Sequence, residues 1–184
     1  MDTFEILSQL CSAAGVSGAE GSAAEAAAKL LEEYGEVTLD NALGSVICKV
    51  GSWEDGKPVM LLDAHIDEIG MIVTYITEDG FLKISGCGGL DTRLLLAQQV
   101  TVYGREKLTG IVTSTPPHLE KDSSDAPELD SVFIDIGFTS RENAAKNVSL
   151  GDRVLIENKA ERRAGSRVTS KAIDDRSGCT AILK

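Results

Sequence analysis

Aromatic residues, positive charge and long apolar runs are all scarce in this chain of 184 residues. Aromatics make up only 4% of it, so the hydrophobic core must be built from Leu, Ile, Val and Ala, within an apolar fraction of 42% that is normal for globular proteins. The 18 Lys and Arg are outnumbered by 29 Asp and Glu, for a net charge of -11. Such acidity repels nucleic acid and anionic membranes, and no apolar run approaches the roughly 18 residues of a membrane span. We therefore expect neither nucleic acid nor a membrane as a partner.

Cysteines are few and have no pattern. The four of them are scattered as Cys11, Cys48, Cys87 and Cys179, without a CxxC pair. This spacing argues against a disulfide framework and against a thiolate metal site. The amino terminus contains two acids and no basic flank, which is not the pattern of a signal peptide. We expect a cytoplasmic protein with reduced thiols.

The distribution of helix and strand signals predicts an α/β layer that is interrupted by an all-β module. Apolar spacing predicts helices over residues 3–14 and 19–34, and β-branched runs then predict strands over 36–40, 45–50 and 59–62. The next part predicts one short helix, 140–147, and six short strands typical of a barrel or sandwich: 71–76, 81–85, 98–104, 108–114, 132–137 and 152–157.

The last part of the chain combines a basic patch with a second helical signal. Residues 159–167 are rich in Lys and Arg, and we expect them to be a solvated linker or an interface edge. A helical pattern begins again after this patch and has barely developed at Lys184. We therefore expect the chain to be a truncated piece of a longer protein.

Only two histidines are present, and one of them lies in a polar cluster. His65, Asp67 and Glu68 follow directly after the predicted strand 59–62. Side chains two residues apart on an extended chain share a face, so Asp67 can hydrogen-bond the His65 imidazole, as metal-bound histidines usually require. The alternative is a histidine that is merely hydrogen-bonded at the end of a strand, beside exposed acids.

A second polar cluster lies where the last helix is predicted to begin. Asp174 and Asp175 are followed by Ser-Gly, which permits a tight turn and would present one carboxylate to a divalent metal. The alternative is an ordinary helix amino terminus, where the macrodipole favours Asp.

Taken together, the two clusters resemble one family of enzymes. The segments AHIDEIGMIV and KAIDDRSG match its metal motifs, and weaker matches are GVSGAEG, DNALGSVI, GIVTSTPPHL and IDIGFTSRENA. The family comprises the glutamyl, deblocking and tetrahedral aminopeptidases, which are dinuclear metallopeptidases; some members are labelled cellulase M or endoglucanase. The resemblance covers essentially all 184 residues.

The resemblance implies a role for each matching residue. His65 would be a metal ligand, Asp67 would orient His65 and act in catalysis, and Asp174 would bridge two divalent metal ions, zinc or cobalt. Asp175 would be the structural neighbour of Asp174 across a strained peptide bond. The second histidine, His118, lies in the inserted module, and we assign it no ligand role. The family's general-base Glu and its other three metal ligands would lie beyond Lys184.

The resemblance also implies a fold, an activity and partners. A zinc-peptidase-like α/β catalytic domain over 1–69 and 166–184 would be interrupted by a PDZ-like or barrel-like dimerisation domain over 70–165. The activity would be removal of amino-terminal residues from short peptides, in homo-oligomers whose dimers assemble into a dodecamer. Two alternatives remain open: a catalytically inert fragment that acts only in folding or assembly, and a glycoside hydrolase, as the endoglucanase label suggests.

Overall fold

The computed structural model describes residues 1–40, 42–114 and 127–184, which form two compact units. The first unit combines Met1–Glu68 with Asn158–Lys184, and the second is Ile69–Glu157. The second unit is thus inserted into the first. We predicted the second boundary at residue 165, whereas this division places it after Glu157.

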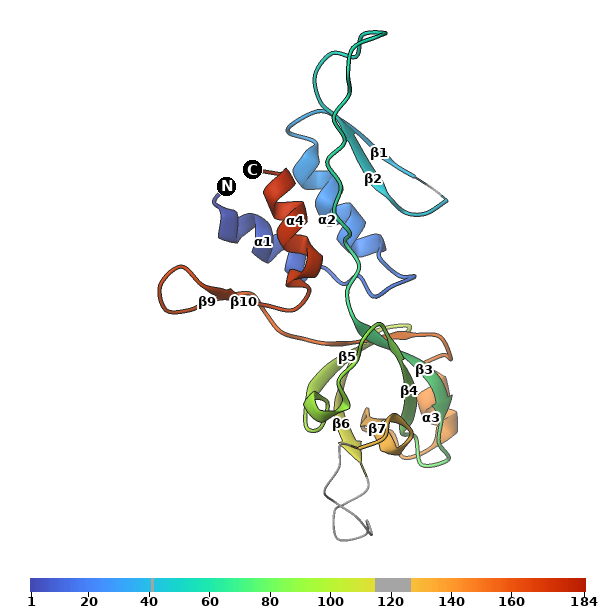
Figure 1. Cartoon of the computed structure of the whole chain (residues 1–184). Helices are drawn as coiled ribbons and strands as arrows, with labels where there is room; N and C mark the ends of the chain where they lie inside the picture. Colours follow the sequence, from blue (N-terminus) through green and yellow to red (C-terminus); the bar gives the residue numbers. More distant parts are fainter. Residues whose placement is uncertain (41, 115–126) are drawn as a thin grey trace. The chain divides into compact units, whose positions relative to one another are not determined.

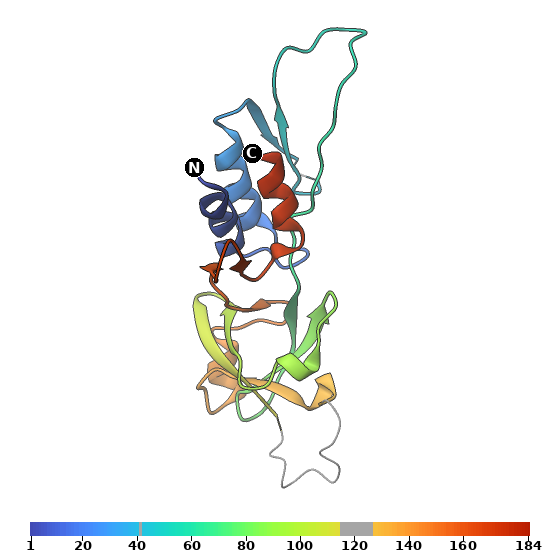
Figure 2. The same ribbon diagram turned by 60° about the vertical axis from the view of Figure 1, so that its left-hand side comes forward.

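Three helices build the first unit. They are α1 (Thr3–Ser12), α2 (Gly21–Leu31) and α4 (Ile173–Ile182), which lie side by side in Figures 1 and 2. The helix α1 begins with a capping box, in which Asp2 and Glu5 each accept a hydrogen bond of 2.7 Å from the other's backbone N–H. The apolar residues that the three helices share form a small core: Ile6, Leu10, Ala27 and Leu183. All three predicted helices are confirmed.

Two short hairpins complete the first unit. The strands β1 (Glu36–Leu39) and β2 (Val46–Lys49) pair antiparallel, as do β9 (Glu161–Arg162) and β10 (Val168–Thr169). The second hairpin occupies the basic patch that we predicted to be a solvated linker or an interface edge. Arg162 of this hairpin forms an ion pair of 2.6 Å with Asp2.

The predicted buried strand at residues 59–62 is wrong. This segment has no strand assignment, and no strand among the described residues pairs with it. Its four apolar side chains, Val59, Met60, Leu61 and Leu62, are 61–84% exposed. A run of consecutive apolar residues forms a buried strand only where neighbouring strands supply hydrogen bonds and helices or another layer cover both faces.

The second unit is a closed barrel of six antiparallel strands. The strands are β3 (Gly70–Ile76), β4 (Leu82–Cys87), β5 (Gln99–Tyr103), β6 (Lys107–Ser114), β7 (Val132–Asp135) and β8 (Arg153–Ile156). Their order around the barrel is β3-β4-β7-β6-β5-β8. All six predicted strands are confirmed, and so is the barrel-like form of the insertion; the PDZ-like form stays a prediction.

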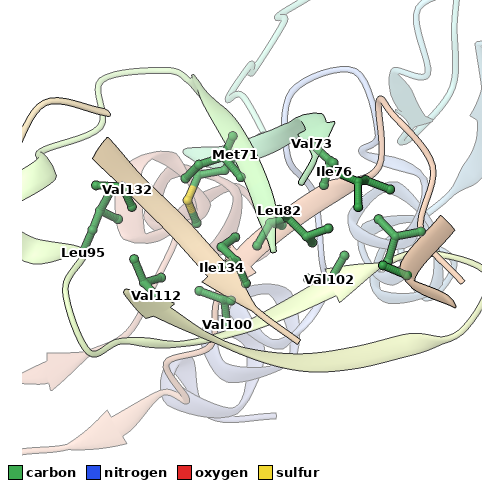
Figure 3. Packing of buried hydrophobic residues seen from close by; sticks show 14 residues of the cluster. Met71, Val73, Ile76, Leu82, Leu95, Val100, Val102, Val112, Val132 and Ile134 are labelled. Atoms are coloured by element: carbon green, nitrogen blue, oxygen red, sulfur yellow. The ribbon is translucent and has the colours of Figure 1, made fainter. Parts of the chain in front are cut away.

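The barrel has a core of its own, built from aliphatic side chains (Figure 3). Alternate residues of the strands point inward, so that Val100 and Val102 of β5 are fully buried while Thr101 between them is not. The fully buried members also include Met71, Leu82, Leu95, Val132, Ile134 and Val154. The short helix α3 (Arg141–Ala145) lies within the predicted helix 140–147, is capped by the Ser140 side chain and adds Ala144 to this core.

Two further structural findings bear on the sequence predictions. All four cysteines are free, as expected. In the parts of the chain that the structure describes, no helix is long and apolar enough to cross a bilayer. Two short 3-10 turns also lie in the described part of the chain, Thr92–Leu94 and Leu129–Ser131.

Candidate metal centre

His65 is held from one side by a carboxylate. Its Nδ1 lies 2.9 Å from Oδ1 of Asp67, and the other oxygen of Asp67 accepts a hydrogen bond from the Ser17 hydroxyl. An imidazole that donates from Nδ1 presents the lone pair of Nε2, which is the tautomer that binds metal. The local geometry thus leaves Nε2 of His65 facing away from Asp67, and each oxygen of the Asp67 carboxylate has a partner.

The two adjacent aspartates at the start of α4 point to different partners. The peptide bond between Asp174 and Asp175 is cis. Oδ1 of Asp175 turns back to accept the backbone N–H of Gly178 at 3.0 Å, in the manner of a helix cap. A Cβ at Gly178 would lie within 2.6 Å of both oxygens of this carboxylate, so a larger residue there would displace the Asp175 side chain. Asp175 therefore follows the helix-terminus alternative, whereas Asp174 is left free of the helix with its side chain 95% exposed.

Asp174 lies opposite the free nitrogen of His65. Its Oδ1 is 3.2 Å from Nε2 of His65. When Nδ1 carries the ring proton, Nε2 and the carboxylate oxygen are both acceptors, and two acceptors this close require a proton or a cation between them. The structure therefore brings together the three residues that the sequence singled out.

The spacing of these two atoms fits a shared metal ion. Zinc binds imidazole nitrogen and carboxylate oxygen at about 2.0–2.2 Å, so two neighbouring ligands in a tetrahedral site lie roughly 3.4 Å apart. The 3.2 Å separation of the His65 and Asp174 atoms is close to this value. Among residues 1–40, 42–114 and 127–184, however, no group of three or more His, Cys, Asp or Glu side chains could hold a metal. The described residues thus bring together two candidate ligand atoms, His65 Nε2 and Asp174 Oδ1.

The thiol nearest to these residues is not a further ligand. Sγ of Cys179 donates a hydrogen bond to the backbone carbonyl of His65 at 3.4 Å. Burial raises the pKa of the Cys179 thiol, and the negative charge of Asp175 raises it further. Cys179 therefore stays protonated at neutral pH and serves to fix the backbone of His65. The other histidine, His118, lies outside the described residues.

A buried ionic cluster, which the sequence analysis missed, joins the two motifs. Glu68, next to Asp67, accepts from Lys171 Nζ at 2.8 and 2.9 Å and from Arg176 Nη2 at 3.2 Å. The side chains of Glu68 and Arg176 are 2% and 0% exposed, and that of Lys171 is 10% exposed. In the sequence these residues look like ordinary exposed charges, and the only available signal was their position beside the two motifs.

The chain was compared with known proteins by sequence. The family model described as M42 glutamyl aminopeptidase matches residues 44–184. FrvX of Escherichia coli K12 is 35% identical over 98% of this chain and 51% of its own length. The glutamyl aminopeptidase of Lactococcus lactis is 27% identical over 100% of this chain and 54% of its own length. The chain therefore spans about half the length of the relatives it matches.

Solved structures of known proteins are also similar to this chain in their fold. The TET1 peptidase of Pyrococcus horikoshii, which can assemble into a tetrahedron or a large octahedral shell, matches with a TM-score of 0.87 and 30% identity. The match covers 99% of this chain and 55% of that one. A protein of Thermotoga maritima named an endoglucanase matches with a TM-score of 0.80 and 31% identity, over 96% of this chain and 52% of that one. With the family model spanning most of the sequence and the fold shared at this level, the chain belongs to the M42 glutamyl aminopeptidase family.

Proposed function

We propose that this protein is a metal-dependent aminopeptidase that removes amino-terminal residues from short peptides, using two divalent metal ions, zinc or cobalt. The observation that supports this most is the approach of His65 Nε2 to Asp174 Oδ1 at 3.2 Å, in a chain of the M42 family. A histidine oriented by a carboxylate and a second carboxylate facing it form a donor set suited to such ions.

Each residue has a distinct task in this proposal. His65 would hold one metal, and Asp174, whose side chain is 95% exposed, would be the carboxylate shared by the two metals. Asp67 holds the His65 ring in the binding tautomer and is itself fixed by Ser17. Bound divalent metals lower the pKa of water toward neutrality and polarise the carbonyl that is attacked.

We also propose that the protein acts in the cytoplasm as a homo-oligomer in which the barrel, Ile69–Glu157, is the dimerisation domain. The four free cysteines support a reducing compartment. Assembly of the related TET1 peptidase into a tetrahedron or a large octahedral shell supports the homo-oligomer, and a dodecamer built from dimers is the form that the family resemblance implies.

The isolated 184-residue chain is itself catalytically inert in this proposal. Stable zinc sites take three or four protein ligands, whereas the described residues converge only two on one point. The chain should therefore lose zinc or cobalt on dialysis and release no product from amino-acid anilides. Dialysis-resistant, stoichiometric metal would contradict this part of the proposal.

The glycoside hydrolase alternative rests on the name of the Thermotoga maritima relative and has no support from the site. Glycosidases use two carboxylates about 5–10 Å apart on either side of a sugar groove that is lined by aromatics. Here the Asp67 carboxylate is engaged by His65 and Ser17, and the single tryptophan, Trp53, stacks with Lys49.

Replacement of His65 tests the peptidase proposal. Hydrolysis of amino-acid p-nitroanilides with added Zn²⁺ or Co²⁺ would be measured in any longer form of the protein that contains this chain. His65→Ala should abolish metal-dependent release, because it removes a ligand, while the circular dichroism spectrum stays unchanged. Glu54→Gln, which breaks an exposed ion pair with Lys57, is the matched control and should retain full activity. Equal turnover in His65→Ala and the unaltered protein would refute the proposal.

A further inference from the structure

We propose that Glu68, Lys171 and Arg176 form a positioning cluster that sets the distance between His65 and Asp174. This inference rests on the proposed function, because it assigns the cluster to metal binding. The contacts of the three side chains are with one another and with the backbone of residues 10–15 and 66, so the cluster acts on His65 and Asp174 through the segments that carry them.

Arg176 connects three separate parts of the chain with one guanidinium. Its Nη1 donates to the carbonyls of Leu10 and Ala13 at 2.5 and 2.6 Å, and its Nε donates to the carbonyl of Ile66 at 3.1 Å. Ile66 lies between His65 and Asp67, and Arg176 itself lies two residues after Asp174. The side chain thus ties the His65 segment directly to the turn that carries Asp174.

Glu68 completes the connection from the other side. Besides Lys171 and Arg176, its carboxylate accepts the backbone N–H of Gly15 at 2.9 Å, and its own N–H donates to the Gly15 carbonyl at 2.8 Å. A Cβ at Gly15 would lie 2.6 Å from Arg176 Nη2, so glycine is required for this close approach. Lys171 also donates to Ala13 at 3.2 Å. The same short segment, residues 13–15, is therefore bonded to both motifs.

The chemistry of the cluster favours a positioning role over a purely stabilising one. Buried ion pairs lose much of their attraction to desolvation, and apolar side chains of similar volume often stabilise a fold equally well. Charged groups add hydrogen bonds of fixed geometry, because the N–H groups of the planar guanidinium point in defined directions toward each carbonyl. Metal sites need their ligands held within about 0.5 Å, which is the tolerance that such bonding provides.

The test separates position from stability by measuring metal binding at an unchanged fold. Co²⁺ would be titrated into this chain while the ring resonances of His65 and the backbone amide spectrum are recorded by NMR. Arg176→Lys keeps the positive charge but loses the planar guanidinium fork. Glu68→Gln keeps the shape of the side chain but loses its negative charge. Lys171→Met keeps the apolar stem but loses the ammonium group. Removal of supporting bonds behind metal ligands typically weakens binding 10–100-fold.

We expect about 10-fold weaker Co²⁺ binding at His65 in Arg176→Lys and Glu68→Gln, with native amide spectra. A smaller loss, about 3-fold, is expected for Lys171→Met, because Arg176 still holds Glu68. The control is Arg162→Gln, which breaks the exposed ion pair with Asp2 in the same unit and should leave Co²⁺ binding unchanged.

Three results would overturn the proposal. Unchanged Co²⁺ affinity in the folded variants would reduce the cluster to a stabilising role. Loss of the folded spectrum in all three variants would do the same, because the cluster would then be needed for folding itself. Absence of any His65 response to Co²⁺ in the unaltered chain would refute the proposed function as well, and that result is distinct from the other two.

Discussion

Leu82 offers a direct test of the barrel as an independently packed unit. It lies on β4 opposite Ile76 of β3 and Ile134 of β7, and it is completely buried. Leu82→Ala removes three carbon atoms, which at about 0.8 kcal/mol each forfeits about 2.4 kcal/mol of burial. The cavity that remains among rigid strands adds to this, so we expect a total loss of about 3–5 kcal/mol.

Native-state hydrogen exchange of the amides of β4 and β5 would measure this loss, because those amides open only when the barrel opens. The midpoint of thermal unfolding of the barrel should fall by more than about 10 °C. The matched control is Leu94→Ala, a leucine of the same unit that is 66% exposed and should change stability by less than about 0.5 kcal/mol. A loss below about 1 kcal/mol in Leu82→Ala, or equal losses in both variants, would refute the packing described here.

Three further predictions concern other parts of the chain. Gly110→Ala should destabilise the barrel by about 1–3 kcal/mol in urea unfolding, because the new Cβ would lie 2.6 Å from the Cγ2 of Ile134. The double substitution Met60→Ser and Leu61→Ser should leave the thermal midpoint unchanged and reduce self-association in sedimentation velocity, since both side chains are 84% exposed. Asp2→Ala should destabilise α1 at neutral pH, because it removes the ionised cap of this helix. The hydrogen bond from the Glu5 backbone N–H and, to a smaller extent, Arg162 lower the pKa of the Asp2 carboxyl below its ordinary value. A carboxyl whose pKa is lowered by folding stabilises the folded state at pH values above its unfolded pKa of about 3.9. The difference in stability between Asp2→Ala and the unaltered chain should therefore vanish as the pH falls through the folded-state pKa.

The strands of the barrel could be predicted because their signal is local. In β5 the buried Val100 and Val102 alternate with Thr101 and Tyr103, and this period of two is visible in any extended segment with one buried face. The pairing order was not predictable, because β4 and β7 are neighbours although β5 and β6 lie between them in the sequence. Long-range pairing depends on the whole set of strands and leaves no local pattern.

The structure of residues 59–62, in contrast to the barrel strands, was not predicted correctly. Four consecutive apolar residues predict burial, but the pattern does not show which other segment would cover them. The exposure of Met60 and Leu61 therefore depends on partners that a reading of the segment alone cannot supply. The basic hairpin β9–β10 was missed for a related reason, since two-residue strands are too short to show a period.

The candidate site also has features that could be predicted from the sequence and features that could not. The proximity of His65, Asp67 and Asp174 was predictable from the family resemblance of the two motifs, and their roles at a metal stay a prediction. The burial of Glu68 and Arg176 was not predictable, because a charged residue gives no sign in the sequence of whether its partner is buried with it. Their burial results from the meeting of α1, α4 and the His65 segment.

The most direct test of the account is the position of a bound metal in crystals of this chain. Crystals soaked in Zn²⁺ would be measured at the zinc absorption edge, and anomalous difference density would locate the ion. The account predicts a peak within about 2.0–2.2 Å of both His65 Nε2 and a carboxylate oxygen of Asp174. Density only at other side chains, with His65 still bonded directly to Asp174, would contradict it.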